Sequence, residues 1–549
     1  NDDFNREKKV LILIEENITK WKERGIFPEV SIEDGENTGQ LIRERGWKYW
    51  HQLFNPREIL LNCLFYERLI NYAKSTNEKV VSLLAINKII DINSKLTLWN
   101  PGTSKSGPTF ANLSLNTMFN YAVRPVSALY PTFKFKINNY YFRKNSNVKP
   151  IDARQLSANQ NIWITDPSYA DAVNYHEVSE FFLSWNKNLL NKTFPSWYTD
   201  SKRVLAVKGY GESFKRSMVD IYRNLSTNMP ENGYQVVMFT HQNPSVWADL
   251  TLILWSAGLH VTSAWNISTE TESGGLKEGN YVKGTVLLVL KKLSSTTTAY
   301  KDELYPEIEQ EVKNQIASMR ELDDKEEPNF YDPDYLLAAY AASLKVLTSY
   351  SQIEDINIEY ELSKPRNAKK PSPIEEIITS AIRIAYDQLI PAGFDSFTWK
   401  SLQPAERFYI KGLELEKTGI KQIAAYQEMA RGFGIADYKA LLASTKANKV
   451  RLKTAKELGT KMLRNNDPFS DTLVRHLLMA FYQAIKTENS INARSYLKSE
   501  APDYDSNRNT LISLCEYFAK MEHYSEMQHR EIESQYARYL IQLLKDDMV

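Results

Sequence analysis

Cysteines and long apolar runs are scarce in this chain. It has two cysteines among 549 residues, Cys63 and Cys515, far apart in sequence. Neither belongs to a zinc-ligand spacing, so the pattern excludes a structural zinc site and a disulfide framework. No run of ~18 apolar residues is present, which argues against a transmembrane helix, and no signal peptide is recognised. We therefore expect no membrane association and a cytoplasmic location.

The chain also lacks a charge of one sign. Its 68 basic residues face 67 acidic ones, a formal net charge of +1. This balance excludes a bulk electrostatic signature for nucleic acid, but not a local basic groove, because phosphate binding needs a patch and not a net charge. The seven histidines show no histidine–carboxylate metal spacing, so we expect no metal.

The length predicts three or four domains at ~150 residues each. Residues 1–155 are expected to be mainly helical with an insertion, because the stretch from 100 to 150 is rich in Asn, Ser, Pro and Tyr. Residues 156–295 form an α/β core, residues 296–330 a helix and linker, and residues 331–549 a large helical C-terminal domain.

Strand and helix patterns alternate within the predicted core. In chain order they are a strand at 161–165, helices at 175–190 and 211–225, a strand at 233–241, a helix at 244–257, and strands at 259–269 and 283–293. This order is typical of the C-terminal half of an open α/β sheet. The last two strands have no helix between them and should pair as a hairpin, so one edge strand should run antiparallel.

An acid, a proline and a tyrosine stand where the first of these strands gives way to a helix, in the stretch Asp166-Pro167-Ser168-Tyr169. Ligands of open α/β sheets sit beyond the carboxyl ends of the strands. The Asp166 side chain and the rigid Pro167 carbonyl could accept both protons of an aromatic amine, and Tyr169 offers a flat face for a base taken out of its stack. The alternative interpretation is an ordinary strand-to-helix turn with Asp166 as a helix cap.

The tetrapeptide resembles the Asp-Pro-Pro-Tyr signature of amino-group DNA methyltransferases, which use S-adenosylmethionine. Together with the stretches at 165–185, 236–273 and 402–452, it resembles the adenine-specific DNA methyltransferases of bacterial anti-phage defence islands. The resemblance implies a Rossmann-like class I methyltransferase sheet, an N-terminal domain of unknown function and a helical C-terminal extension. It also implies methylation of the N6 amine of adenine in double-stranded DNA, with ATPase, helicase or nuclease subunits as partners.

The resemblance assigns roles to individual residues. Asp166 and Pro167 would accept from the target amine, Ser168 stands where the family usually has proline, and Tyr169 would stack on the flipped base. The residues expected to shape the base pocket are Asp171, Asn174, Tyr175 and His241.

The glycine-rich cofactor loop of the family has no counterpart in this chain. "VKGYGESF" at 207–214 follows the acidic tetrapeptide, whereas the family's glycine loop precedes it. The loop is therefore expected upstream of Asn1 or on a separate polypeptide. This leaves open a non-catalytic DNA-binding or scaffold subunit of the same defence complex, and also an enzyme acting on the amine of cytosine.

A basic stretch near residue 450 is a candidate DNA surface. It is expected on a helix, where it would serve as a DNA or partner surface or be simply solvated. Its candidate DNA-binding residues are Lys446, Lys449, Arg451 and Lys453.

Overall fold

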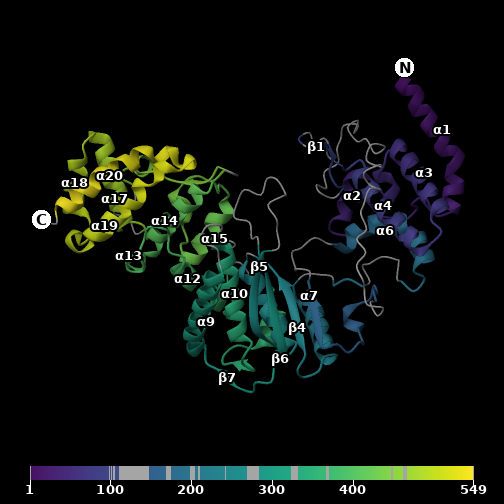
Figure 1. The fold of residues 1–549 in the computed structure, drawn as a ribbon, viewed down its shortest axis with the longest axis horizontal. Coiled ribbons are helices and arrows are strands. Elements are labelled where there is room, and N and C mark those ends of the chain that lie inside the picture. Colours follow the sequence, from purple (N-terminus) through teal and green to yellow (C-terminus); the bar gives the residue numbers. More distant parts are fainter. Residues whose placement is uncertain are drawn as a thin grey trace. The chain divides into compact units, whose positions relative to one another are not determined.

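The chain folds into two compact units (Figure 1). The first comprises Asn1–Ser157 and Ala170–Gly209, and the second Ala158–Tyr169 and Tyr210–Val549. The computed structural model describes residues 2–97, 99–100, 102, 105–109, 147–167, 175–197, 205–207, 211–241, 243–268, 284–322, 330, 332–365, 370–446, 449–461 and 467–547.

Helices build the first unit, as predicted. They are α1 (Asp2–Glu23), α2 (Thr38–Arg45), α3 (Pro56–Tyr72), α4 (Thr76–Ile92) and α6 (Tyr175–Thr193). Asn55 and Ser75 precede α3 and α4 and form capping boxes, which satisfy free N–H groups at the N-terminus of each helix. The short elements are η1 (Trp50–Leu53), η2 (Ala153–Gln155), and the antiparallel pair β1 (Trp99–Asn100) and β2 (Lys105–Ser106).

One hydrophobic core joins α6 to the N-terminal helices. Phe181 and Trp185 of α6 are buried in the same cluster as Trp21 and Trp50, and Phe54 stacks on Phe181 with ring centroids 5.6 Å apart. The helix predicted over 175–190 therefore exists, and it packs with the helices of residues 1–92 as part of the first unit, so the predicted 156–295 core is divided between the two units.

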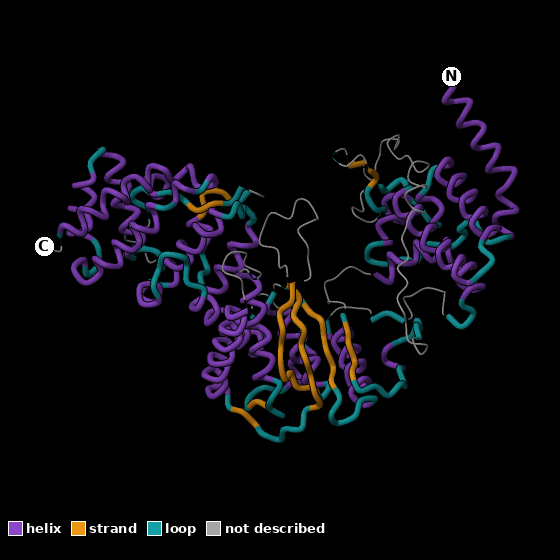
Figure 2. The backbone as a smooth tube through the Cα atoms, in the orientation of Figure 1, coloured by secondary structure: helices purple, strands orange, loops and turns teal. Residues whose placement is uncertain are grey.

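A four-stranded sheet forms the centre of the second unit, with its strands side by side (Figure 2). Its order is β3 (Ile162–Thr165), β4 (Tyr234–Phe239), β6 (Gly284–Lys292) and β5 (Leu259–Ser268). β3 runs parallel to β4, and β6 runs antiparallel to both β4 and β5. The predicted α/β class and the predicted hairpin of the last two strands are thus confirmed.

The antiparallel strand lies inside the sheet, and the expectation that it would be an edge strand is wrong. β6 lies between β4 and β5, so β5 is the edge. The sequence of β6, "GTVLLVLKK", is apolar on both faces in its middle, which suits an interior strand. β5 carries polar residues and a bulge between Val261 and Ser263, which suit an edge.

Three helices cover one face of this sheet: α7 (Glu212–Thr227), α8 (Pro244–Ser256) and α10 (Asp332–Leu347). Phe239 of β4 meets Trp247 of α8 edge-on at 4.9 Å, and Trp247 stacks on Tyr340 of α10 at 5.3 Å. The strand residues on this face, among them Val237, Leu288 and Leu290, are fully buried. A hydrophobic core therefore lies between this face of the sheet and the three helices.

The rest of the second unit is mainly helical. α9 (Lys301–Leu322) packs on α10 and α12, so the helix predicted within 296–330 exists and is packed, while residues 323–329 of the predicted linker lie outside the described residues. The remaining helices are α11 (Ile358–Ser363), α12 (Pro373–Gln388), α13 (Ser396–Ser401), α14 (Pro404–Lys417), α15 (Ile423–Phe433), α16 (Ala455–Leu458), α17 (Leu473–Thr487), α18 (Ser490–Glu500), α19 (Tyr504–Ala519) and α20 (Glu531–Asp546).

Short strands and 3-10 turns connect these helices. The strands are β7 (Thr298–Ala299) with β8 (Gln352–Ile353), and β9 (Leu442–Ser444) with β10 (Arg451–Leu452). The 3-10 turns are η4 (Tyr438–Leu441), η5 (Met521–His523) and η6 (Ser525–Arg530). Of the helices in the described ranges, none combines the length and apolar content needed to cross a bilayer.

Candidate functional site

The predicted acceptor residues stand at the carboxyl end of β3. Thr165, the last residue of β3, pairs with Val237 of β4, and Asp166 and Pro167 follow at once. His241 lies two residues beyond the end of β4. Because the two strands are parallel and adjacent, their carboxyl ends lie at the same end of the sheet, which is where open α/β sheets bind ligands. Asp166, Pro167 and His241 therefore lie at the carboxyl ends of the strands, the position expected for them from the sequence.

A buried tyrosine supports the turn after β3. Tyr222 of α7 is almost wholly buried, and its hydroxyl lies 3.4 Å from the Thr165 hydroxyl. Burial raises the pKa of Tyr222, and the nearby Asp166 carboxylate raises it further. The Gln235 side-chain amide donates to the Tyr222 carbonyl at 3.4 Å. α7 thus holds the end of β3 in place, while the Asp166 side chain stays exposed.

Sequence reasoning missed Tyr222. The apolar periodicity of the segment 211–225 predicts a helix face of Phe214, Met218, Ile221 and Leu225. The buried face instead includes Tyr222 and leaves Ile221 only half-buried. The signal was available in part: Tyr222 follows Met218 by four residues and Phe214 by eight, which is helical spacing. Its contact with Thr165 depends on tertiary packing and leaves no trace in the sequence.

The turn after β4 is ordered by His241 and Asn243. His241 Nδ1 accepts a hydrogen bond from the Asn243 N–H at 2.9 Å, and the His241 carbonyl accepts from Trp247 Nε1 at 2.7 Å. The Asn243 side chain accepts from the Ser245 N–H at 3.1 Å and caps α8, whose first residue is Pro244. The imidazole is therefore held just beyond the carboxyl end of β4. Its Nδ1 is a hydrogen-bond acceptor, which requires the tautomer that carries the proton on Nε2.

The other predicted pocket residues have different placements. Tyr175 is the first residue of α6 in the first unit, and its side chain is exposed. Four of the residues predicted for the site lie outside the described residues: Ser168, Tyr169, Asp171 and Asn174. Among the described residues, Asp166, Pro167 and His241 are the predicted site residues that follow the carboxyl ends of β3 and β4.

The residues predicted to bind DNA lie on a hairpin, and the expectation of a helix is wrong. Val450 and Leu452 are fully buried on either side of Arg451 in β10, a period of two that is typical of a strand. Lys446 and Lys449 are exposed between β9 and β10. Arg451 instead forms a bidentate pair with Glu457 at 2.7 and 2.6 Å, and Lys453 Nζ donates to the Ala440 carbonyl at 2.6 Å.

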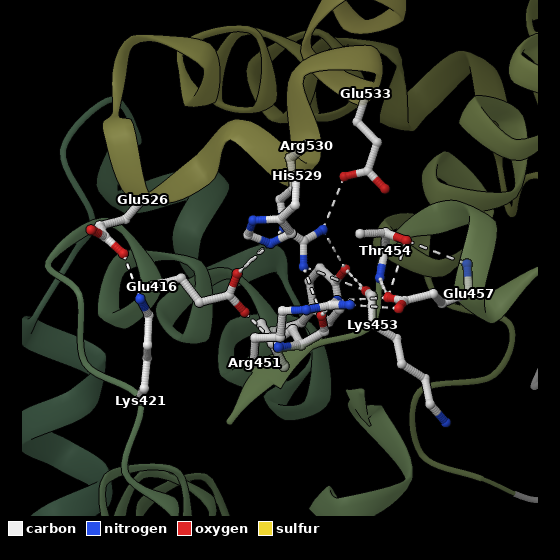
Figure 3. Close-up of polar contacts among 12 residues, drawn as sticks. Glu416, Lys421, Arg451, Lys453, Thr454, Glu457, Glu526, His529, Arg530 and Glu533 are labelled. Carbon is white, nitrogen blue, oxygen red and sulfur yellow. Dashed lines mark hydrogen bonds and ion pairs between the residues drawn. The ribbon is translucent and has the colours of Figure 1, made fainter. Parts of the chain in front are cut away.

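A buried ionic network anchors this hairpin (Figure 3). Arg530 has no exposed surface and lies between Glu416 and Glu533, at 3.5 and 2.9 Å. Its guanidinium also donates to the Tyr409 hydroxyl at 3.1 Å and to the Leu452 carbonyl at 3.2 Å. Burial alone would raise the pKa of Glu416, but the charges of Arg530 and the neighbouring His529 lower it. Arg530, at the end of η6, therefore links the hairpin to Glu416 of α14 and Glu533 of α20.

No protein-family model, curated protein or solved structure matches the chain.

The described residues do not fit the methionine end of S-adenosylmethionine. None of their glycines forms a glycine-rich turn directly after a strand. Gly211 caps α7 at φ +60°, Gly258 closes α8 at φ +75°, and an added Cβ at Gly233 would meet Met229. In the same ranges, no group of three His, Cys, Asp or Glu side chains could hold a metal ion.

Proposed function

We propose that this chain is the base-binding part of an S-adenosylmethionine-dependent DNA methyltransferase. Its target would be the N6 amine of adenine in host DNA, marked as part of an anti-phage defence system. The observation that supports this most directly is the position of Asp166 and Pro167 at the carboxyl end of β3, beside the carboxyl end of β4 with His241. The sequence resemblance supplies the reaction and the biological setting.

The chemistry follows from the weakness of an aromatic amine as a nucleophile. The nitrogen lone pair of adenine N6 is delocalised into the ring. Two acceptors that hydrogen-bond both amine protons favour the lone pair leaving the ring system as attack begins. The Asp166 carboxylate and the Pro167 carbonyl supply two such acceptors, and the fixed φ of proline rigidifies the second. The same chemistry serves the exocyclic amine of cytosine, so the choice of adenine rests on the resemblance.

A DNA-binding or scaffold subunit without methyl transfer is the second candidate function. It is supported by the lack of a glycine-rich turn after a strand among the described residues. It is also supported by Lys446 and Lys449, which are exposed on an anchored hairpin and suited to phosphate contact.

Methyl transfer from labelled S-adenosylmethionine to host DNA, assayed with the full complex, tests the proposal. Asp166→Ala removes one acceptor and should lower the rate by about 10²-fold or more, the usual effect of losing one preorganised transition-state partner. Asp166→Asn keeps one acceptor oxygen and should retain more activity than the alanine variant.

Asp505→Ala is the matched control, because Asp505 has an 87% exposed side chain in a surface pair with Arg508. It should leave the rate unchanged. Full activity of Asp166→Ala would refute the role of Asp166, and mapping of the modified base decides between adenine and cytosine. A full complex that binds DNA but transfers no methyl group would favour the scaffold function.

A further inference from the structure

The His241 imidazole is held in one tautomer by the turn that follows β4. Its Nδ1 accepts from the Asn243 N–H at 2.9 Å, so the proton of the neutral ring stands on Nε2, the nitrogen farther from the backbone. The His241 carbonyl accepts from Trp247 Nε1 at 2.7 Å. Trp247 is itself buried between Phe239 and Tyr340. His241 therefore presents a hydrogen-bond donor whose position is set by the packed start of α8.

This donor lies close to the two proposed acceptors. Thr165 pairs with Val237 in the parallel ladder of β3 and β4. Asp166 and Pro167 continue from Thr165, and His241 lies two residues beyond the end of β4. Adjacent strands of a sheet are about 4.8 Å apart. A planar ligand that spans the two strand ends therefore has the Asp166 carboxylate, the Pro167 carbonyl and the His241 N–H around one edge.

Two acceptors and one donor are the complement of an amino-substituted base. The exocyclic amine of adenine or cytosine donates two protons, and the ring nitrogen beside it, N1 of adenine or N3 of cytosine, is an acceptor. Guanine and thymine have a carbonyl oxygen and a ring N–H at these two positions. Each of them would set acceptor against acceptor and donor against donor. Enzymes that flip a base read this same Watson–Crick edge.

We propose that His241 selects the target base by donating its Nε2–H to the ring nitrogen next to the methylated amine. The inference rests on the proposed methyl transfer and adds the class of base that the site accepts. A base without that nitrogen would leave the N–H facing a C–H group in the complex, and an enclosed donor without an acceptor costs free energy. His241 thus acts on the choice of base, while Asp166 and Pro167 act on the amine.

Base analogues test the inference in the full complex, on a duplex that contains the mapped methylation position. 1-Deazaadenine at this position lacks N1, whereas 7-deazaadenine keeps it. The ratio of kcat/KM on 7-deazaadenine to kcat/KM on 1-deazaadenine should be about tenfold or more larger for the wild type than for His241→Ala, the effect of one hydrogen bond. Differences in the intrinsic reactivity of the two amines cancel in this comparison. If mapping finds cytosine, cytosine and 3-deazacytosine take the place of the two analogues.

Two further variants separate reading of the base from a structural effect. His241→Gln keeps a side-chain N–H donor and should keep part of the wild-type ratio, whereas support of the turn alone would give the glutamine and alanine variants equal ratios. His260→Ala is the matched control. His260 is the second residue of β5, which runs in the same direction as β4, so it lies at the opposite end of the sheet from His241. This variant should keep the wild-type ratio.

The outcomes distinguish this inference from the proposed function. Equal ratios for the wild type and His241→Ala, with methyl transfer still measurable, would overturn the inference and leave the proposed function standing. A lower rate on both analogues with an unchanged ratio would do the same, because His241 would then only support the turn. Absence of methyl transfer to unmodified host DNA by the full complex would refute both.

Discussion

At the scale of single residues, the site depends on one exposed carboxylate and one buried hydroxyl. Asp166 is exposed at its strand end, while the hydroxyl of Tyr222 beneath it is buried against Thr165. The exposed carboxylate is free to accept from a ligand, and the buried tyrosine positions the strand that carries it. The sequence predicted the proposed acceptor Asp166, but it did not predict Tyr222, which positions the strand end.

Glu58 carries a pH-dependent part of the stability. It is buried in the first turn of α3, and burial raises the pKa of its carboxyl from 4.5 to about 7. Between these two values the folded chain keeps the proton and the unfolded chain has lost it. The free energy of unfolding should therefore fall as the pH rises through this window, by about 2–3 kcal/mol. Urea unfolding at the two ends of the window measures this change.

Glu58→Gln stays neutral and can still accept from the Asn55 N–H, as Glu58 does at 2.8 Å. Its unfolding free energy should fall less than that of the wild type over the same window. Glu16→Gln, at an exposed position of α1, should behave as the wild type. Equal pH dependence of the Glu58→Gln variant and the wild type would contradict this assignment.

At the scale of elements, the contact that joins α6 to the N-terminal helices is a carboxylate at a helix end. Asn37 at the start of α2 makes no side-chain capping bond. The Glu177 carboxylate instead accepts from the N–H groups of Glu36, Asn37 and Thr38 at 2.9–3.0 Å. α6 thereby caps α2 across more than a hundred residues of sequence, with a negative charge at the positive end of the helix.

Glu177→Ala should lower the unfolding free energy of the first unit by about 2 kcal/mol or more, because it leaves three N–H groups without their acceptor. Tryptophan fluorescence during urea unfolding reports this, since Trp21, Trp50 and Trp185 lie in that core. Glu15→Ala, at an exposed position of α1, should change the stability by less than about 0.5 kcal/mol. An equal effect of both variants would show that the Glu177 contact is not a cap.

The buried network around Arg530 should contribute more to stability than an exposed ion pair does. Arg530→Ala leaves the buried Glu533 carboxylate without its counter-charge and Glu416 with His529 alone, and should cost about 3–5 kcal/mol in unfolding free energy. Arg530→Lys keeps the charge but loses the guanidinium fork, so it should fall between this variant and the wild type. Lys421→Ala breaks the exposed pair with Glu526 and should cost about 0–1 kcal/mol. Urea unfolding ranks the three variants, and similar losses for Arg530→Ala and Lys421→Ala would contradict the network's role.

Much of the element order could be predicted from the sequence, and the packing partners could not. Apolar periodicity predicted β3, β4, α7, α8 and the final hairpin at nearly their observed bounds. The same periodicity shows that α6 has an apolar face without showing which core receives it. The prediction missed the position of β6 inside the sheet, although the apolar residues on both of its faces suit an interior strand. The prediction of a helix at 446–453 was wrong because the alternation of buried and exposed residues there covers only three positions, too few to stand out within a run of lysines.

At the scale of the whole molecule, the residues predicted for one site fall in two units. Asp166, Pro167 and His241 belong to the second unit, and Tyr175 belongs to the first. The predicted boundary at 155 lies near the observed division at 157, but the chain returns to the first unit for 170–209. A boundary drawn along the sequence cannot express such a return, since composition does not change where the chain crosses between units.

The two exposed lysines of the hairpin, Lys446 and Lys449, should contribute to DNA binding through phosphate contacts. Lys446→Ala with Lys449→Ala should weaken binding to any duplex and reduce the slope of log affinity against log salt by about one for each lysine, because each phosphate contact releases one counterion. Arg451→Ala should act mainly on hairpin stability, since Arg451 is paired with Glu457. The measurement is fluorescence anisotropy of a labelled duplex over a salt series. Lys8→Ala with Lys9→Ala, exposed on α1, removes the same charge elsewhere and should leave the slope unchanged. Equal slopes for both double variants would mean that the hairpin lysines face solvent alone, and the DNA path would then have to lie on another surface.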